Sequence, residues 1–79
     1  MIKFYNYNVL VVDDDETVRK LLSQNIETLS NVVVDCAESL EKAKSKIRKN
    51  SYHLIIADYH LNPGTAIDIL NLVKSINPR

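Results

Sequence analysis

The stretch His53-Leu54-Ile55-Ile56-Ala57-Asp58-Tyr59-His60-Leu61 decides the fold that this sequence predicts. Its four apolar residues, 54–57, run directly into Asp58. A loop of turn-forming residues follows, namely Asn62, Pro63 and Gly64. A short apolar run closed by turn residues indicates a strand buried on both faces, as in a parallel sheet. Asp58 is then expected at the carboxyl end of this strand, where open α/β sheets bind ligands, although a lone aspartate there more often caps a turn.

Length and composition predict one small globular domain. The chain has 79 residues, 46% of them hydrophobic and 25% charged, so we expect a single domain over residues 1–79, near the size at which one core becomes marginal. Ten basic residues balance ten acidic ones, which argues against direct binding of nucleic acid or of an anionic membrane. The sequence has neither an apolar run of membrane-spanning length nor a signal-peptide pattern, so we expect a cytoplasmic protein. The single cysteine, Cys36, excludes a disulfide framework.

Two further apolar runs predict strands. Residues 9–12 form one of them, and the β-branched residues 32–34 form the other, which ends at Asp35. Apolar residues recur at helical spacing after each of the three runs, so strands and helices alternate as β-α-β-α-β-α. This order predicts an α/β fold with a parallel sheet and helices on both faces. Crossovers in such sheets are right-handed, so few topologies remain.

The three expected helices each have an apolar stripe and a starting signal. The stripes consist of Val18, Leu21, Leu22, Ile26 and Leu29 in the first helix, Leu40, Ala43 and Ile47 in the second, and Ala66, Ile69, Leu70, Val73 and Ile76 in the third. Asp15 and Ser39 are expected N-caps of the first two helices. Thr65 and Asp68 fit a capping box for the third, which we expect to end at residues 77–78.

Acidic residues follow two of the expected strands. Asp13 and Asp14 come directly after residues 9–12, and Asp58 comes directly after residues 54–57. The carboxyl ends of parallel strands lie along one edge of a sheet, so adjacency of these two strands would bring the three carboxylates together. Their like charges favour a bound cation, and Mg²⁺ is commonly held by few carboxylates and several waters. Such a cation would neutralise a phosphoryl group, and a carboxylate could then act as the nucleophile and form an aspartyl phosphate.

The segments VLVVDDD (residues 9–15) and LIIADYHL (residues 54–61) closely resemble the two acidic motifs of response-regulator receiver domains. The resemblance extends from about residue 8 to residue 79. It implies a flavodoxin-like fold in which the three strands present lie in the order 2-1-3. It also implies that Asp58 is a phosphoacceptor, which takes a phosphoryl group from a histidine kinase or a histidine phosphotransfer protein. The Mg²⁺ ligands implied by the resemblance are Asp13, Asp14, Asp58 and the backbone carbonyl of His60.

The resemblance also shows what this sequence lacks. Receivers have five strands, with a hydroxyl residue at the end of the fourth and a lysine at the end of the fifth, and both would follow residue 79. We therefore expect a truncated receiver over residues 1–79. Asn62 and Ala66 stand where many receivers have proline and glycine, which affects loop shape rather than the acidic site. In a sheet that stops after residues 54–57 the third strand is an open edge, so we expect a symmetric homodimer joined through it.

Two functions are compatible with these patterns. The first is a phosphorelay receiver, a signalling phosphoprotein rather than an enzyme, that accepts a phosphoryl group on Asp58 with Mg²⁺. The alternative is a receiver-like interaction or dimerisation module that is not phosphorylated, or a fragment of a longer response regulator. A small-molecule enzyme is disfavoured because the sequence shows neither a general base nor a glycine-rich cradle beyond the acidic edge.

Overall fold

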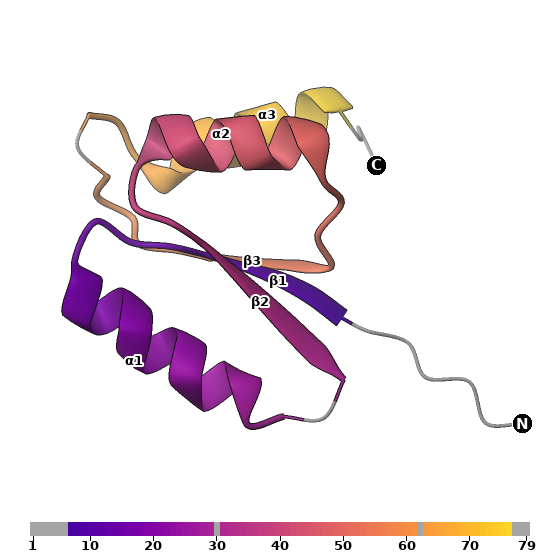
Figure 1. Ribbon diagram of the computed structural model, residues 1–79. Coiled ribbons are helices and arrows are strands. Elements are labelled where there is room, and N and C mark those ends of the chain that lie inside the picture. Colours follow the sequence, from indigo (N-terminus) through magenta and orange to yellow (C-terminus); the bar gives the residue numbers. More distant parts are fainter. Residues whose placement is uncertain (1–6, 30, 62, 77–79) are drawn as a thin grey trace, which may run out of the picture.

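A computed structural model describes residues 7–29, 31–61 and 63–76 of the chain. The elements follow one another as β1 (Tyr7–Val12), α1 (Glu16–Glu27), β2 (Val32–Ala37), α2 (Leu40–Lys49), β3 (Leu54–Ala57) and α3 (Ala66–Ile76). The strands form one parallel sheet in the order β2-β1-β3. Helix α1 covers one face of this sheet, and α2 and α3 cover the other (Figure 1). The predicted fold class, strand order and placement of helices on both faces are thus confirmed.

The central strand β1 carries the middle of the core. It pairs with β2 along its whole length and with β3 from residue 9 onward. Its last four residues, 9–12, are buried, because a strand with neighbours on both sides and helices above and below has no route to solvent. The core cluster on the α2 and α3 face contains Leu10, Val12, Ala37, Leu40, Ala43, Ile47, Leu61 and Ile69.

Strand β3 differs from the expectation of burial on both faces. Leu54 is 53% exposed, and residues 55–57 are only partly buried. The strand pairs on one side only, with β1. Helix α1 packs on β1 and β2 and does not extend over β3, so the α1 face of this edge strand is open to solvent.

Strand β2 is longer than its β-branched run predicted. It continues through Asp35 and Cys36 to Ala37, so Asp35 lies within the strand and does not end it. The carboxylate of Asp35 accepts hydrogen bonds from Lys46 of α2 and from Tyr52. These partners compensate the partial burial of a charged side chain inside a strand.

Helix α1 begins as predicted, but only part of its predicted stripe packs on the sheet. The side chain of Asp15 accepts hydrogen bonds from the backbone N–H groups of residues 17 and 18, as an N-cap does. Of the predicted stripe, Val18, Leu21 and Leu29 are exposed. Ser23 is the buried residue of the helix, and Leu22 and Ile26 of the predicted stripe lie on the same face and are partly buried.

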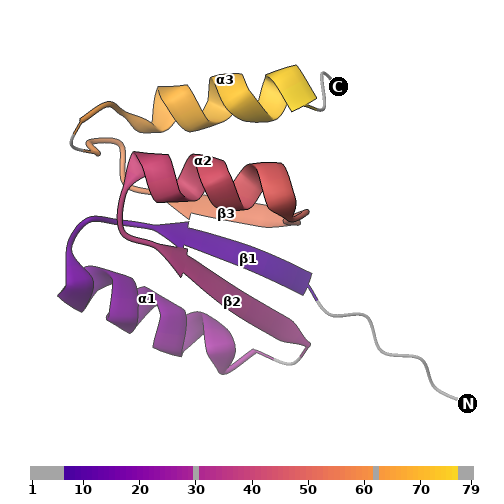
Figure 2. The same ribbon diagram turned by 45° about the horizontal axis from the view of Figure 1, so that its top comes forward.

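Helices α2 and α3 lie side by side, with α3 on the β3 side of the sheet (Figure 2). The predicted stripe of α2 is confirmed, since its three residues are all buried. The capping box of α3 is also confirmed: Thr65 N–H donates to Asp68, and Ile67 N–H donates to the Thr65 hydroxyl. In α3, Ile69 is buried, while Leu70 and Ile76 of the predicted stripe are exposed. The expected end at residues 77–78 lies outside the described residues.

Candidate functional site

Three carboxylates meet at the carboxyl edge of the sheet. Asp13 and Asp14 follow β1, Asp58 follows β3, and one oxygen from each lies within 4.8 Å of the others. The two strands are neighbours, and the Asp58 N–H donates to the Val12 carbonyl at 3.0 Å, which continues their ladder to the site. Asp13 is buried, at 7% exposure, whereas Asp14 and Asp58 face solvent. The sheet therefore gathers the three predicted acids into one cluster that a ligand can reach from outside.

Asp13 is held through both its backbone and its side chain. Its N–H donates to the carbonyl of Ala37 at 3.2 Å, which links it to the end of β2. Its Oδ1 accepts a hydrogen bond from the N–H of Asp15 at 2.8 Å. Its carbonyl oxygen accepts a hydrogen bond from Nη1 of Arg19 at 2.7 Å. These contacts, which come from three parts of the chain, leave the Asp13 carboxylate little freedom.

The remaining acids of the run 13–16 serve helix α1. The Asp15 side chain is turned to the backbone of the first helical turn as its cap. Glu16 forms an exposed ion pair with Lys20 at 3.0 Å, and the hydrogen bond from Lys20 holds the pKa of Glu16 below its ordinary value. Two acids of the run therefore join the cluster, and the other two stabilise the helix N-terminus.

The loop after Asp58 is closed by backbone hydrogen bonds. The Leu61 N–H donates to the Gly64 carbonyl at 3.0 Å, and the Ala66 N–H donates to the Tyr59 carbonyl at 2.9 Å. Leu61 is buried and anchors the loop in the core, whereas His60 lies on the surface with its ring against that of Tyr59. The role of the His60 carbonyl as a metal ligand stays a prediction.

The donor set suits a hard divalent cation. Every side chain in the cluster offers carboxylate oxygen, which is the ligand that Mg²⁺ and Ca²⁺ prefer, and the set contains no sulfur or imidazole. A bound cation would offset the repulsion of three like charges held this close together. Two of the three carboxylates are exposed, so waters could complete the coordination of a cation, as is usual for Mg²⁺ in proteins.

Arg19 is the residue near the site that the sequence did not single out. It lies four residues after the N-cap Asp15, where a basic residue is ordinarily read as part of a solvated helix face. Its hydrogen bond goes to a backbone carbonyl, which every residue has, so the sequence pattern could not predict the contact.

The comparisons with known proteins agree with this geometry. Residues 9–79 match the response regulator receiver domain family. The non-phosphorylated HemR receiver domain from Leptospira biflexa has the same fold, with a TM-score of 0.82 and 23% identity over 92% of this chain and 58% of that one. The beryllofluoride-activated NtrC4 receiver domain dimer gives a TM-score of 0.80 and 30% identity over 90% of this chain and 58% of that one.

The chain thus spans somewhat more than half the length of the receiver structures that it matches. Among curated proteins, none matches this sequence. Within the described ranges, the helices are too short or too polar to cross a bilayer. The family match covers β1 from residue 9 and all of β2 and β3. It also includes the three residues of the carboxylate cluster. The chain therefore belongs to the family of response regulator receiver domains.

Proposed function

We propose that this chain is a phosphorelay receiver whose Asp58 accepts a phosphoryl group from a histidine kinase or a histidine phosphotransfer protein. The observation that carries the proposal is the meeting of Asp13, Asp14 and Asp58 at one edge of the sheet, with Asp58 accessible to a partner. Family membership supports the signalling role. The protein would act in the cytoplasm as a substrate of the relay, and it would not turn over a small molecule of its own.

The proposed step is an in-line displacement at phosphorus. A carboxylate oxygen of Asp58 forms the new O–P bond while the P–N bond of the donor phosphohistidine breaks, and the released imidazole takes up a proton. Mg²⁺, held by Asp13, Asp14, Asp58 and the His60 carbonyl, would supply charge neutralisation for the phosphoryl oxygens. Within the chain, the hydrogen bonds to the Asp13 side chain and carbonyl hold this member of the carboxylate cluster in place. The ladder bond at Asp58 holds the nucleophile at the strand end.

Native mass spectrometry with a small phosphodonor tests this function. We expect one added phosphoryl group per chain in the presence of Mg²⁺, and none without it or in Asp58→Ala. Asp15→Asn is the matched control, because it removes a neighbouring negative charge but keeps an N-cap. Labelling of this control should equal that of the wild type. The absence of any adduct on a folded protein that also fails to bind Mg²⁺ would favour the interaction module instead.

We further propose that the open edge of β3 pairs with a second copy of the chain. Because the Asp58 N–H points to β1 and backbone groups alternate along a strand, those of Ala57 and Ile55 point away from β1. Among the described residues, no strand pairs with this edge. Two copies related by a two-fold axis could pair Ile55 of each with Ala57 of the other in an antiparallel ladder.

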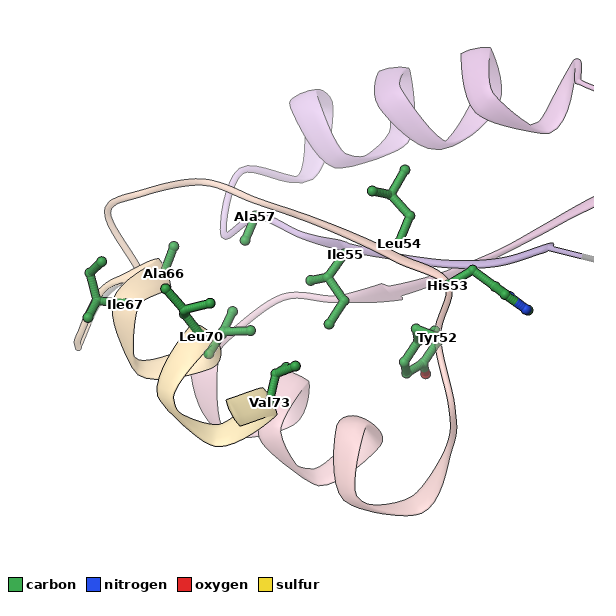
Figure 3. A pocket seen from close by; sticks show the side chains of 10 residues that line it. Tyr52, His53, Leu54, Ile55, Ala57, Ala66, Ile67, Leu70 and Val73 are labelled. Carbon is green, nitrogen blue, oxygen red and sulfur yellow. The ribbon is translucent and has the colours of Figure 1, made fainter. Parts of the chain in front are cut away.

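An apolar groove beside this edge supports the pairing. It lies between β3 and α3 and has a volume of about 510 Å³. Ile55 and Val73 face the groove, and Leu54, whose side chain points to the opposite face of the sheet, lines its margin (Figure 3). Leu70 of α3 is 47% exposed along the same groove, so a partner strand would cover apolar surface on both elements. The NtrC4 receiver domain, which this chain resembles, forms a dimer.

Sedimentation velocity tests whether two copies of the chain associate through the edge of β3. We expect a dimer at micromolar concentration that dissociates in Leu54→Lys, because a charge on an exposed edge opposes strand pairing. Leu21→Lys is the control, since Leu21 is similarly exposed, at 59%, but lies on α1. A wild-type monomer with a cooperative unfolding transition would exclude the dimer and leave the phosphorelay proposal unaffected.

A further inference from the structure

The bond between Arg19 and the carbonyl of Asp13 joins helix α1 to the buried member of the acidic cluster. The Nη1–O distance is 2.7 Å, and the contact is partly buried. The pKa of Glu16 and that of Glu38 are lowered mainly by the lysine that pairs with each of them. The positive charge of Arg19 adds a smaller effect in the same direction. Within the described ranges, however, Arg19 forms no ion pair with a carboxylate. Among the described residues, the guanidinium of Arg19 donates one hydrogen bond, and its acceptor is the neutral Asp13 carbonyl at the site.

That carbonyl has no backbone partner in the described part of the chain. The β1–β2 ladder ends with the Asp13 N–H on Ala37, and helix α1 begins only at residue 16. The Asp13 peptide therefore lies in the gap between strand and helix, where neither element supplies it with a donor. Arg19, in the first turn of the helix, supplies the missing donor to the Asp13 carbonyl. The Asp15 N–H donates to the Asp13 side chain, so both ends of this residue are held.

We infer that Arg19 is a positioning residue for the cation site, which it serves by fixing the Asp13 peptide so that the Asp13 carboxylate faces Asp14 and Asp58. This inference rests on the proposed Mg²⁺ role of the cluster. Donors that orient a ligand are commonly worth about tenfold to a hundredfold in metal affinity. Arg19 would act on a bound cation through Asp13, since its guanidinium contacts the Asp13 carbonyl.

The direction in which Mg²⁺ affinity changes when Arg19 is replaced distinguishes a positioning role from a purely electrostatic one. Arg19 carries a positive charge near a site for a positive ion, so its charge alone weakens Mg²⁺ binding. If charge were its whole influence, removing it would tighten binding. If it positions Asp13, removing it weakens binding in spite of the electrostatic relief.

Mg²⁺ titration of the intact chain by calorimetry, far below the unfolding temperature, decides between the two. We expect the dissociation constant to rise about tenfold in Arg19→Met, which keeps the aliphatic stem but loses the donor, and to recover largely in Arg19→Lys. Lys20→Met is the matched control: it removes an equal charge from the same turn, and Lys20 pairs only with exposed Glu16. Its dissociation constant should stay the same or fall.

A second readout needs no metal. The amide proton of Asp15 reports its hydrogen bond to Oδ1 of Asp13, so its NMR shift in the metal-free protein should change in Arg19→Met but not in Lys20→Met. Binding in Arg19→Met that equals or exceeds the wild type, with an unchanged Asp15 amide, overturns the inference and leaves the proposed function standing. A wild type that binds no Mg²⁺ overturns the proposed cation site, and the amide shift then still decides whether Arg19 fixes Asp13.

Discussion

The phenol of Tyr52 donates a hydrogen bond of 2.6 Å to Oδ2 of Asp35, and this bond connects the two outer strands of the sheet. Tyr52 precedes β3, Asp35 lies within β2, and β1 runs between the two strands. Lys46 of α2 donates to the other oxygen of Asp35 at 2.5 Å. One partly buried carboxylate thus ties β2, α2 and the start of β3 together at the end of the sheet opposite the acidic cluster.

Tyr52→Phe should reduce stability and change its alkaline limit. Burial, together with the hydrogen bond to Asp35, raises the pKa of Tyr52 from 10.0 to about 12. The raised pKa means that the neutral phenol stabilises the fold below pH 10, and that this contribution is lost as pH rises toward 12. We expect a loss of about 1 kcal/mol near neutral pH, a modest value because the Asp35 side chain is 39% exposed.

Urea unfolding of wild type and Tyr52→Phe between neutral pH and pH 11 measures this effect. The difference in unfolding free energy between the two proteins should shrink as the pH rises above 10, because the Tyr52 phenol then ionises in the unfolded wild type while the native state still holds its proton. A difference that is constant over this range would show that the phenol contributes through packing alone.

Asp35→Asn should make the stability of the fold depend less on pH in the acidic range. Burial opposes ionisation of Asp35, but hydrogen bonds from Lys46, Tyr52 and the Cys36 N–H outweigh it and hold the pKa of Asp35 below its ordinary value of 3.8. A lowered pKa contributes stability that is present above about pH 4 and is lost as pH falls below it. The variant should be less stable at pH 6 and should lose less on acidification, as measured by thermal unfolding from pH 6 to pH 2.5.

Ser39→Ala should destabilise helix α2. The Ser39 hydroxyl accepts a hydrogen bond from the Lys42 N–H at 3.1 Å, and the loss of such an N-cap typically costs about 1 kcal/mol. Ser45→Ala provides the control, because Ser45 is exposed inside the same helix, where alanine is the better helix former. Chemical denaturation should show Ser39→Ala below and Ser45→Ala at or above the wild type. Equal effects of the two changes would contradict a capping role.

Gly64→Ala should be strongly unfavourable. Gly64 has a φ of +101°, and a Cβ there would lie 2.5 Å from Cδ2 of Leu40 and 2.8 Å from an oxygen of Asp68. Both the backbone conformation and the lack of space argue for a loss of about 1–3 kcal/mol. Far-UV circular dichroism during urea titration measures the loss, and an unfolding midpoint equal to the wild type would show that the loop adjusts freely.

Asp14→Asn should weaken Mg²⁺ binding more than Asp15→Asn. Both substitutions remove one negative charge from the same loop, but only Asp14 has an oxygen in the cluster with Asp13 and Asp58. Asp15 is directed to the helix backbone, and asparagine can replace it as a cap. Calorimetric titration should therefore show a clear rise in the dissociation constant for Asp14→Asn and a small one for Asp15→Asn. Equal rises would mean that the ion is attracted by net charge and not bound by these oxygens.

Parts of the fold followed from local sequence patterns. The stripe of α2 was predicted correctly because Leu40, Ala43 and Ile47 are the apolar residues of an otherwise polar helix, so one packing face is possible. The stripe of α1 was wrong at Val18, Leu21 and Leu29, because apolar residues there occur on several faces and the adjacent strands select among them. The apolar run of β3 predicted burial on both faces, which is wrong, because such a run does not state how many neighbours a strand has. The open edge expected from the resemblance is confirmed, since β3 pairs with β1 alone among the strands that the structure describes.

Local patterns were enough to predict the alternation of strands and helices, the caps at Asp15 and Ser39, and the acids that follow two strands. These are local properties, because apolar period and capping depend on residues a few positions apart. Two contacts became apparent only in the folded chain, namely that of Arg19 with the Asp13 carbonyl and that of Tyr52 with Asp35. The first contact depends on how the chain turns between β1 and α1. The second depends on the assembly of both outer strands on β1, which brings Tyr52 and Asp35 together. The types of these residues do not reveal that they lie close in the folded protein.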